Sequence, residues 1–414
     1  MKAVEQAELA PLSLKFTSSF IGLTILAGLG VGVARVLTSL YAVHLEASAL
    51  QLGLIAAAQS IGLLCMALPV GVLVQRFGSL NIFVLGSLLG AVLYSLQTWY
   101  ANAWYLLALT ALVSFVLPMR FVSIHTLFLT HLRRLGAAKA GWFRGSHMLG
   151  FFLIAPSLSV ALLAQWGYHG AFFAVAALFF AAVLFAPLCF EPHQPTQTTA
   201  SRFSWSELFA PLALLKTHPQ LRTICSLEFL SNIANNYFSF FIVVIAIQNF
   251  ALAESTAVML LTVQGVVFVG SLFGLGALAE LLGYYKFYLV GLLCISSSLL
   301  TLSLTEQALL LWPISIFLGL GLGILHIANF MSFAKVGEQT AMNQISPLLA
   351  LVGPAGGLLG SLAGAAFGQY LGLQSLFAPI GIVFFFMTLF ILRNLHFKTF
   401  LYTESTPPLQ GQEP

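Results

Sequence analysis

Three charged side chains in this sequence lie inside long apolar stretches. They are Arg35, Arg120 and Glu228. A charge in the middle of a lipid bilayer costs several kcal/mol, so such residues usually face a partner or a water-filled interior and mark a transport pathway. Glu228 could therefore bind a proton on one side of a membrane and release it on the other. A fixed salt bridge that holds two helices together is the structural alternative.

A row of polar residues accompanies Glu228. Asn232, Asn235, Asn236 and Ser239 follow it at intervals of 4, 7, 8 and 11 residues, which places all five on one face of an α-helix. A face with three amides and a carboxylate would not point at lipid. We expect it to line a wet cavity or to meet the opposite half of the protein.

The two arginines allow different interpretations. Arg35 shares a helical face with Gly28 and Gly32, a small-xxx-small pair typical of close helix packing. Arg35 could contact the substrate or Glu228. Alternatively, its side chain could extend outward and anchor the helix at the membrane surface. Arg120 follows Pro118 near the middle of its apolar stretch, which favours the cavity. If both arginines face the cavity, one glutamate cannot neutralise them, and the cavity would favour an organic anion.

Two histidines and two glutamines are further candidates for the same interior. His125 and His326 lie at a depth similar to that of Glu228, about 9–14 Å from the nearer membrane surface at the α-helical rise per residue. Either could pair with the glutamate and relay a proton, since histidine titrates near neutrality. A hydrogen-bonded packing role is equally open for both. Gln59 and Gln264 could donate hydrogen bonds to a solute.

The composition indicates what kind of scaffold positions these residues. Of the 414 residues 59% are hydrophobic and only 7% are charged, whereas soluble domains carry roughly 25% charged residues, so we expect an integral membrane protein. The net charge of +4 is too small and scattered for a nucleic-acid site. The first apolar run is too long for a cleavable signal peptide. The sequence has no metal-binding or cofactor-binding motif, so we expect neither a metal ion nor a cofactor. The cysteines form no CxxC pair and are expected to be buried hydrophobes: Cys65, Cys189, Cys225 and Cys294.

Apolar stretches long enough to cross a membrane recur twelve times. The expected spans are residues 16–43, 50–74, 80–99, 104–131, 144–165, 170–190, 222–249, 255–279, 284–304, 308–332, 343–371 and 375–394. If the spans alternate, fourteen of the sixteen Lys and Arg residues lie on one side, and the opposite loops hold none. The positive-inside rule then places both termini in the cytoplasm, with the chain in the plasma (inner) membrane. The sequence therefore predicts an all-α membrane protein.

The chain divides into two similar halves. We expect an N-terminal six-helix bundle in residues 1–190, a cytoplasmic linker in 191–221, a C-terminal six-helix bundle in 222–394 and a cytoplasmic tail in 395–414. A glycine-bounded segment, Gly71–Gly78, follows the second span. A similar segment, Gly276–Gly283, occurs 205 residues later, after the eighth span, and Gln59 matches Gln264 at the same offset. The ordered matches indicate a parallel repeat.

The two glycine-bounded segments resemble a loop motif of the major facilitator superfamily. The resemblance implies two pseudo-twofold-related six-helix bundles around a cavity lined by the first, fourth, seventh and tenth helices. It also implies a cytoplasmic latch that favours one access state, formed here by Gly71, Arg76, Gly78, Gly276, Glu280, Gly283 and Lys286. In the first copy Gln75 stands where the family has Asp, and Ser79 and Leu80 replace the family's basic pair.

A second resemblance is to a Gly-Pro motif in the fifth helix of exporters of the superfamily. Its counterpart here runs from Gly150 to Ala155 and Pro156, with Ala155 in place of the usual glycine. A closer match to the pattern, Gly353 and Pro354, lies in the eleventh span. We expect both segments to pack helices closely.

Together these observations predict a secondary transporter of a small organic solute that works by alternating access. Proton-coupled efflux of an anionic, metabolite-like or siderophore-like solute is the first interpretation, and a proton-symport importer of a nutrient or metal chelate is the alternative. An integral membrane enzyme is disfavoured, because the sequence has no HExxH, GxSxG or paired-carboxylate motif. The expected partners are the solute, the proton and the lipid bilayer, and the expected state is a monomer.

Overall fold

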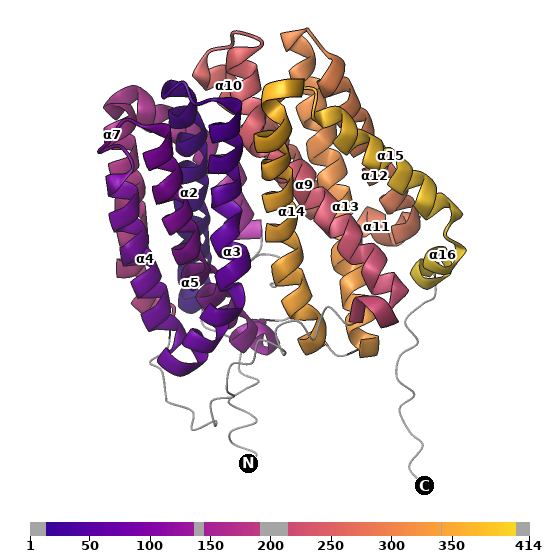
Figure 1. The fold of residues 1–414 in the computed structure, drawn as a ribbon. Coiled ribbons are helices and arrows are strands. Elements are labelled where there is room, and N and C mark those ends of the chain that lie inside the picture. The colour runs from indigo at the N-terminus through magenta and orange to yellow at the C-terminus, as the bar shows by residue number, and fades with distance from the viewer. Residues whose placement is uncertain (1–13, 136–144, 191–213, 341, 403–414) are drawn as a thin grey trace, which may run out of the picture.

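The computed structural model describes residues 14–135, 145–190, 214–340 and 342–402, and every regular element within them is helical (Figure 1). The long helices are α2 (Leu14–His44), α3 (Ala49–Phe77), α4 (Ser79–Leu96), α5 (Ala103–Leu135), α7 (Ala155–Phe185), α9 (Pro219–Gln248), α10 (Glu254–Gly274), α12 (Tyr284–Leu304), α13 (Leu311–Thr340), α14 (Met342–Leu371) and α15 (Phe377–Arg393). Shorter elements are a π-helical turn (Leu149–Ile154), 3₁₀ turns (Ala186–Leu188 and Ala308–Leu310), α11 (Gly276–Leu282) and α16 (Leu395–Tyr402). Most of the expected linker and the end of the expected tail lie outside the described residues.

The long helices account for the predicted membrane spans. Ten helices in the described residues are long and apolar enough to cross a membrane, and an eleventh crossing follows if α15 and α16, which meet at 72°, form one bent span. The longest apolar stretch, Gly145–Leu188, has 44 residues, roughly twice what the apolar core of a bilayer requires. Its helix breaks at Gly167, where φ is 63° and ψ is −177°. This break falls where the sequence predicts the loop between the fifth and sixth spans.

One predicted span is shorter than expected. The eighth span, predicted for residues 255–279, is helical only to Gly274, and the short helix α11 begins at Gly276 after a bend at Leu275. Glycine weakens a helix because it has the most backbone freedom to lose. The two glycines beside Leu275 therefore explain why the helix divides there.

The helices form two bundles that lie side by side (Figure 1). The first bundle contains α2, α3, α4, α5 and α7, and the second contains α9, α10, α12, α13, α14 and α15. The bundles meet where α3 packs against α14, where α2 packs against α9, and where α10 packs against α7 and the π turn. Helices of both bundles therefore form the interface and would line any cavity within it.

The two glycine-bounded segments end in the same backbone conformation. Gly78 has φ 85° and ψ 148°, and Gly283 has φ 83° and ψ 142°. Positive φ of this kind favours glycine, which has no Cβ to clash with the backbone. Equivalent turns at equivalent positions in the two halves agree with the internal repeat in the sequence.

One end of the interface between the bundles is closed. From Tyr237 to Ala246 nearly every side chain of α9 is fully buried. Ser39 donates a hydrogen bond to the carbonyl of Phe240 across the interface (3.0 Å). At the same end the Tyr168 hydroxyl lies 3.1 Å from Glu254 Oε1. We call this the sealed end.

Basic residues of the C-terminal half gather at the opposite end. The Lys335 ammonium, near the end of α13, donates to the carbonyl of Phe400 in α16 (2.6 Å). The Lys398 ammonium lies 5.3 Å from the ring centre of Tyr285 at the start of α12. Three helix termini that carry basic residues therefore meet, as alternating spans require.

Candidate functional site

A cavity of about 220 Å³ lies between the two halves. We call it the central cavity. Its walls come from α2, α9, α10, α13 and the π turn with the residues beside it. Its polar lining consists of Arg35, His147, Glu228, Ser231, Asn232, Asn235, Asn236 and His326. The polar face of α9 that begins at Glu228 therefore points into this cavity.

The Glu228 carboxylate is held by two neutral amides. Asn232 Nδ2 donates to Oε1 (3.1 Å), and Asn329 Nδ2, from α13, donates to Oε2 (2.9 Å). No described residue forms an ion pair with Glu228, so the fixed salt bridge considered from the sequence is not seen in this part of the chain. An amide group can donate to a carboxylate or accept from a carboxylic acid. The surroundings of Glu228 are therefore compatible with either charge state.

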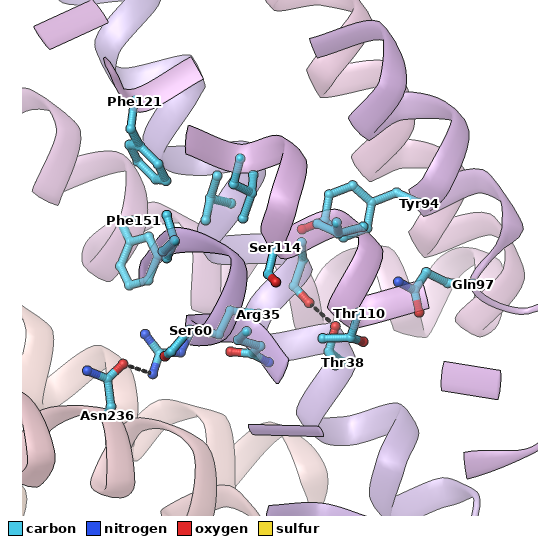
Figure 2. Close-up of a pocket in the computed structure, with 16 residues that line it drawn as sticks. Arg35, Thr38, Ser60, Tyr94, Gln97, Thr110, Ser114, Phe121, Phe151 and Asn236 are labelled. Atoms are coloured by element: carbon cyan, nitrogen blue, oxygen red, sulfur yellow. Dashed lines mark hydrogen bonds between the residues drawn. The ribbon is translucent and has the colours of Figure 1, made fainter. Parts of the chain in front are cut away.

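Arg35 faces the interior from the other half. Its Nη2 donates to Asn236 Oδ1 (2.8 Å), a bond that joins α2 to α9 (Figure 2). Its Nε is buried and has no hydrogen-bond partner among the described residues. Its guanidinium carbon lies 5.9 Å from the ring centre of Phe151 in the π turn. This position does not suit an anchor that reaches outward.

A second cavity, of about 200 Å³, extends into the N-terminal half (Figure 2). We call it the side cavity. Arg35, Phe151 and Asn236 line both cavities, so the two adjoin. The remaining polar lining of the side cavity consists of Thr38 on α2, Gln59 and Ser60 on α3, Tyr94 on α4 and Gln97 at its C-terminal end, and Thr110 and Ser114 on α5.

Arg120 lies outside both cavities. Its guanidinium carbon is 3.7 Å from the ring centre of Phe179 and 5.6 Å from that of Phe83. The side chain is only 2% exposed, and its three nitrogens have no hydrogen-bond partner among the described residues. The expectation that Arg120 lines the cavity therefore does not match the structure, because its face of α5 turns toward α4 and α7. Only Arg35 of the two arginines therefore lines a cavity, and the cavity is less positive than the sequence predicted. The argument for an anionic solute is weakened accordingly.

Of the other four polar candidates, two line a cavity and two do not. His326 lines the central cavity, with its ring centre 6.0 Å from that of Phe268, whereas His125 is exposed and lines neither cavity. Gln59 lines the side cavity. Gln264 is fully buried behind the cavity wall, where its Nε2 donates to Asn235 Oδ1 (3.4 Å).

Some residues of the site were not among the sequence-based candidates. Asn329, which donates to Glu228 without lining either cavity, is three residues after His326 on the same helical face, a spacing that could have identified it. Gln97 and Thr110 lie near the ends of predicted spans, where a polar residue is ordinarily assigned to the membrane surface.

The predicted latch residues lie apart from these cavities. A Cβ added at Gly71 or Gly276 would meet no atom within 4 Å. Arg76 and Lys286 are exposed, and the side chain of Glu280 lies outside the described part of the structure. None of the latch residues whose side chains the structure describes lines either cavity.

The predicted helix-packing residues are at close contacts. Ala155 is fully buried, and a Cβ added at Gly32 would lie 2.6 Å from that of Ala155. Pro156 is buried beside it, at the start of α7. In α14 Gly353 precedes Pro354, and a Cβ added at Gly353 would lie 3.4 Å from the Asn232 side chain. Both segments therefore lie against helices that form the central cavity.

The sequence from residue 20 to residue 346 matches the family model of the Major Facilitator Superfamily. The chain belongs to this superfamily. A transporter of the superfamily carries small solutes, so the family and the fold point to a transporter rather than an enzyme.

Two solved structures have a similar fold. Both are crystal structures of the nucleoside transporter NupG, one of them of a point mutant. The mutant structure has 14% sequence identity and a TM-score of 0.71, and the match covers 93% of this chain and 99% of that chain. The other has 15% identity and a TM-score of 0.70, with 94% and 100% covered. At this identity the likeness shows the fold alone. No curated protein matches the chain.

Proposed function

We propose that this transporter couples the movement of a small organic solute to the movement of a proton, with Glu228 as the proton-binding group. The observation that carries the proposal is the position of Glu228 on the wall of the central cavity, held by neutral amides instead of an ion pair. A carboxyl group in this setting can change its charge without breaking a salt bridge. His326 on the same wall is the second candidate for the proton path.

Export is the direction that we propose first. A solute that binds best to the ionised glutamate competes with the proton, and such competition produces antiport. The resemblance of Gly150 to Pro156 to the exporter motif supports the same direction. That segment includes all but the first residue of the π turn and packs against α2, where a Cβ on Gly150 would meet the carbonyl of Ile25. The site of transport would be the inner membrane, with both termini in the cytoplasm.

A second candidate is import by proton symport. Among the described residues, Arg35 and Glu228 are the only Arg, Lys or Glu side chains that line the central cavity, so protonation of Glu228 would leave Arg35 as the one charge of these types there. A solute anion would then bind best together with a proton. The two candidates predict opposite directions of proton movement for the same movement of solute.

Purified protein in liposomes that contain a pH-sensitive dye would test the proposal. Nucleosides and organic acids form the first panel of solutes, since similar folds include nucleoside transporters. We expect a transported solute to move protons in the wild type. The Glu228→Gln variant should move no protons with any labelled solute that it still exchanges. The exposed loop acid Glu306 provides the matched control, and Glu306→Gln should behave as the wild type.

The sign of the dye signal separates the two candidates. Protons that move against the solute support export by antiport, and protons that accompany the solute support symport. Undiminished proton movement in the Glu228→Gln variant would end the assignment of Glu228.

A further inference from the structure

We propose that the side cavity is a solute subsite that holds an uncharged group rich in hydrogen-bond donors and acceptors, such as a hydroxylated ring or an amide-bearing heterocycle. The rest of the solute extends past Arg35 into the central cavity. This inference rests on the proposed transport of a solute through the central cavity.

Unpaired polar atoms line the side cavity. Gln97 is fully buried at the C-terminal end of α4, and neither its amide nitrogen nor its amide oxygen has a partner among the described residues. The Thr110 hydroxyl on α5 and the Gln59 amide nitrogen on α3 are buried and unpaired in the same way. Buried polar groups in native proteins are nearly always hydrogen-bonded. Three such groups around one cavity indicate a ligand that supplies their partners.

The arrangement of these groups is convergent. Figure 2 shows the Gln97 amide directed from the end of α4 toward the side on which Tyr94 and Thr110 lie. The three unpaired groups come from three different helices of one bundle. A ligand between them would therefore be held from several directions, as specific small-molecule sites require.

The chemistry of the lining selects an uncharged polar group. Gln97 offers both donors and an acceptor, Thr110 offers one donor and two acceptor positions, and Gln59 offers donors. In the part of the chain that the structure describes, Arg35 is the one Arg, Lys or Glu residue that lines the side cavity, and no carboxylate there compensates a cation. The rings of Tyr94 and Phe121 add flat apolar surface. This combination suits a polar ring with hydroxyl or amide groups at its edge.

The sizes of the cavities suggest that the solute occupies both. Small-molecule sites usually begin at roughly 300 Å³, and the side cavity of about 200 Å³ and the central cavity of about 220 Å³ are each smaller. Arg35, Phe151 and Asn236 belong to both walls. If the polar group of the solute occupies the side cavity, the atoms attached to that group lie beside Arg35, and the rest of the solute can enter the central cavity.

Equilibrium binding to purified protein in detergent tests the subsite directly. The probes are labelled uridine, which has a hydroxylated ring and an amide-bearing base, glucose, which has the ring alone, and choline, a cation. We expect uridine or glucose to bind and choline not to bind. Thr110→Val and Gln97→Met should each weaken that binding at least tenfold.

A matched control separates the subsite from a general effect of removing buried hydroxyls. The Thr262 hydroxyl in α10 is also buried and unpaired among the described residues, but Thr262 lines neither cavity. Thr262→Val should bind as the wild type does. The proposal is overturned if neither neutral probe binds, if Thr110→Val and Gln97→Met bind normally, or if Thr262→Val weakens binding to the same extent.

The same assay separates this proposal from proton coupling. Binding in detergent needs no proton gradient and reports on the side cavity, whereas proton movement in liposomes reports on Glu228. If the side-cavity variants lose binding while Glu228→Gln still couples protons, the subsite stands and the assignment of Glu228 fails. If Glu228→Gln uncouples transport while the side-cavity variants bind normally, the assignment stands and the subsite fails.

Discussion

Arg35 is partly buried and Arg120 is almost fully buried, and the two guanidinium groups have different surroundings. Arg35 has an amide partner across the interface and faces two cavities. Arg120 stacks on the ring of Phe179 inside one bundle. Stacking of a cation on an aromatic face contributes most when the cation is desolvated, as it is here. We therefore propose that Arg35 contributes to the transport path, whereas Arg120 lies in the core of the N-terminal bundle.

Replacement of Arg120 by methionine tests this assignment. A buried charge costs several kcal/mol to remove from water, and an apolar side chain of similar volume avoids that cost. We expect Arg120→Met to transport normally and to unfold at the wild-type temperature or above it. Arg120→Lys should unfold at a lower temperature than the wild type, because an ammonium group cannot stack as a planar guanidinium does. Thermal unfolding in detergent, followed by tryptophan fluorescence, measures both changes.

A transport assay on the same variants completes the test. A folded Arg120→Met protein that no longer transports would place Arg120 in the transport path of another access state.

The difference between the two arginines also shows how far the sequence could predict the site. Apolar length gives the depth of a residue in the membrane, and the depths of Arg35 and Arg120 were correctly judged to be internal. Depth does not tell which neighbour a helical face meets. Glu228 was easier to orient, because three asparagines on its face make lipid contact untenable. No such row accompanies Arg120, so the sequence does not show that it faces aromatic rings.

At the scale of elements, the glycines at the two ends of each glycine-bounded segment differ in backbone conformation. Gly78 and Gly283 have positive φ, whereas Gly71 and Gly276 are helical and have open space around the Cβ position. The repeated spacing in the sequence pairs these glycines but does not distinguish them. Backbone conformation therefore predicts different responses to the same substitution.

Alanine substitutions at these four positions test that distinction. We expect Gly78→Ala and Gly283→Ala each to lower the free energy of unfolding by about 1–3 kcal/mol, because an L-residue is strained at that φ. Gly71→Ala and Gly276→Ala should be neutral or should stabilise by up to about 1 kcal/mol, because alanine is the better helix former. Unfolding of the four purified variants in detergent provides the measurement. Equal effects at all four positions would contradict the explanation.

The fold was more predictable than the site, because the length of apolar stretches and the position of glycine are local signals. The break at Gly167 and the turn at Gly283 both fall where the sequence placed loops. The division at Leu275 was missed, because the apolar stretch continues through it. The π turn was missed as well, since its residues Leu149–Ile154 are as apolar as an ordinary span.

At the scale of the whole molecule, the two bundles are joined at the sealed end and enclose cavities farther along the interface. Alternating access requires this end to open, so its contacts must break during each cycle. One of the closest approaches is between the start of α3 and the end of α14. A Cβ added at Gly368 would lie 3.5 Å from the Cβ of Ala49, a separation that suits a disulfide bond.

A disulfide at this point should stop transport. In a chain without native cysteines, Ala49→Cys with Gly368→Cys should cross-link under mild oxidation and lose transport, and a reducing agent should restore it. Each single-cysteine variant serves as a control and should be unaffected by the oxidant. Continued transport by fully cross-linked protein would show that the sealed end need not open.

The π turn beside the cavities gives the wall of the pathway one residue more than an α-helical register holds. A surplus residue can migrate along a helix while both helix ends stay in place. Each side chain that it passes is re-aimed by the angle of one residue, about 100°. Phe151 belongs to this turn and to both cavity walls. The passage past Arg35 could thus be widened or narrowed by a local screw motion of one helix, independently of any rocking of the two bundles.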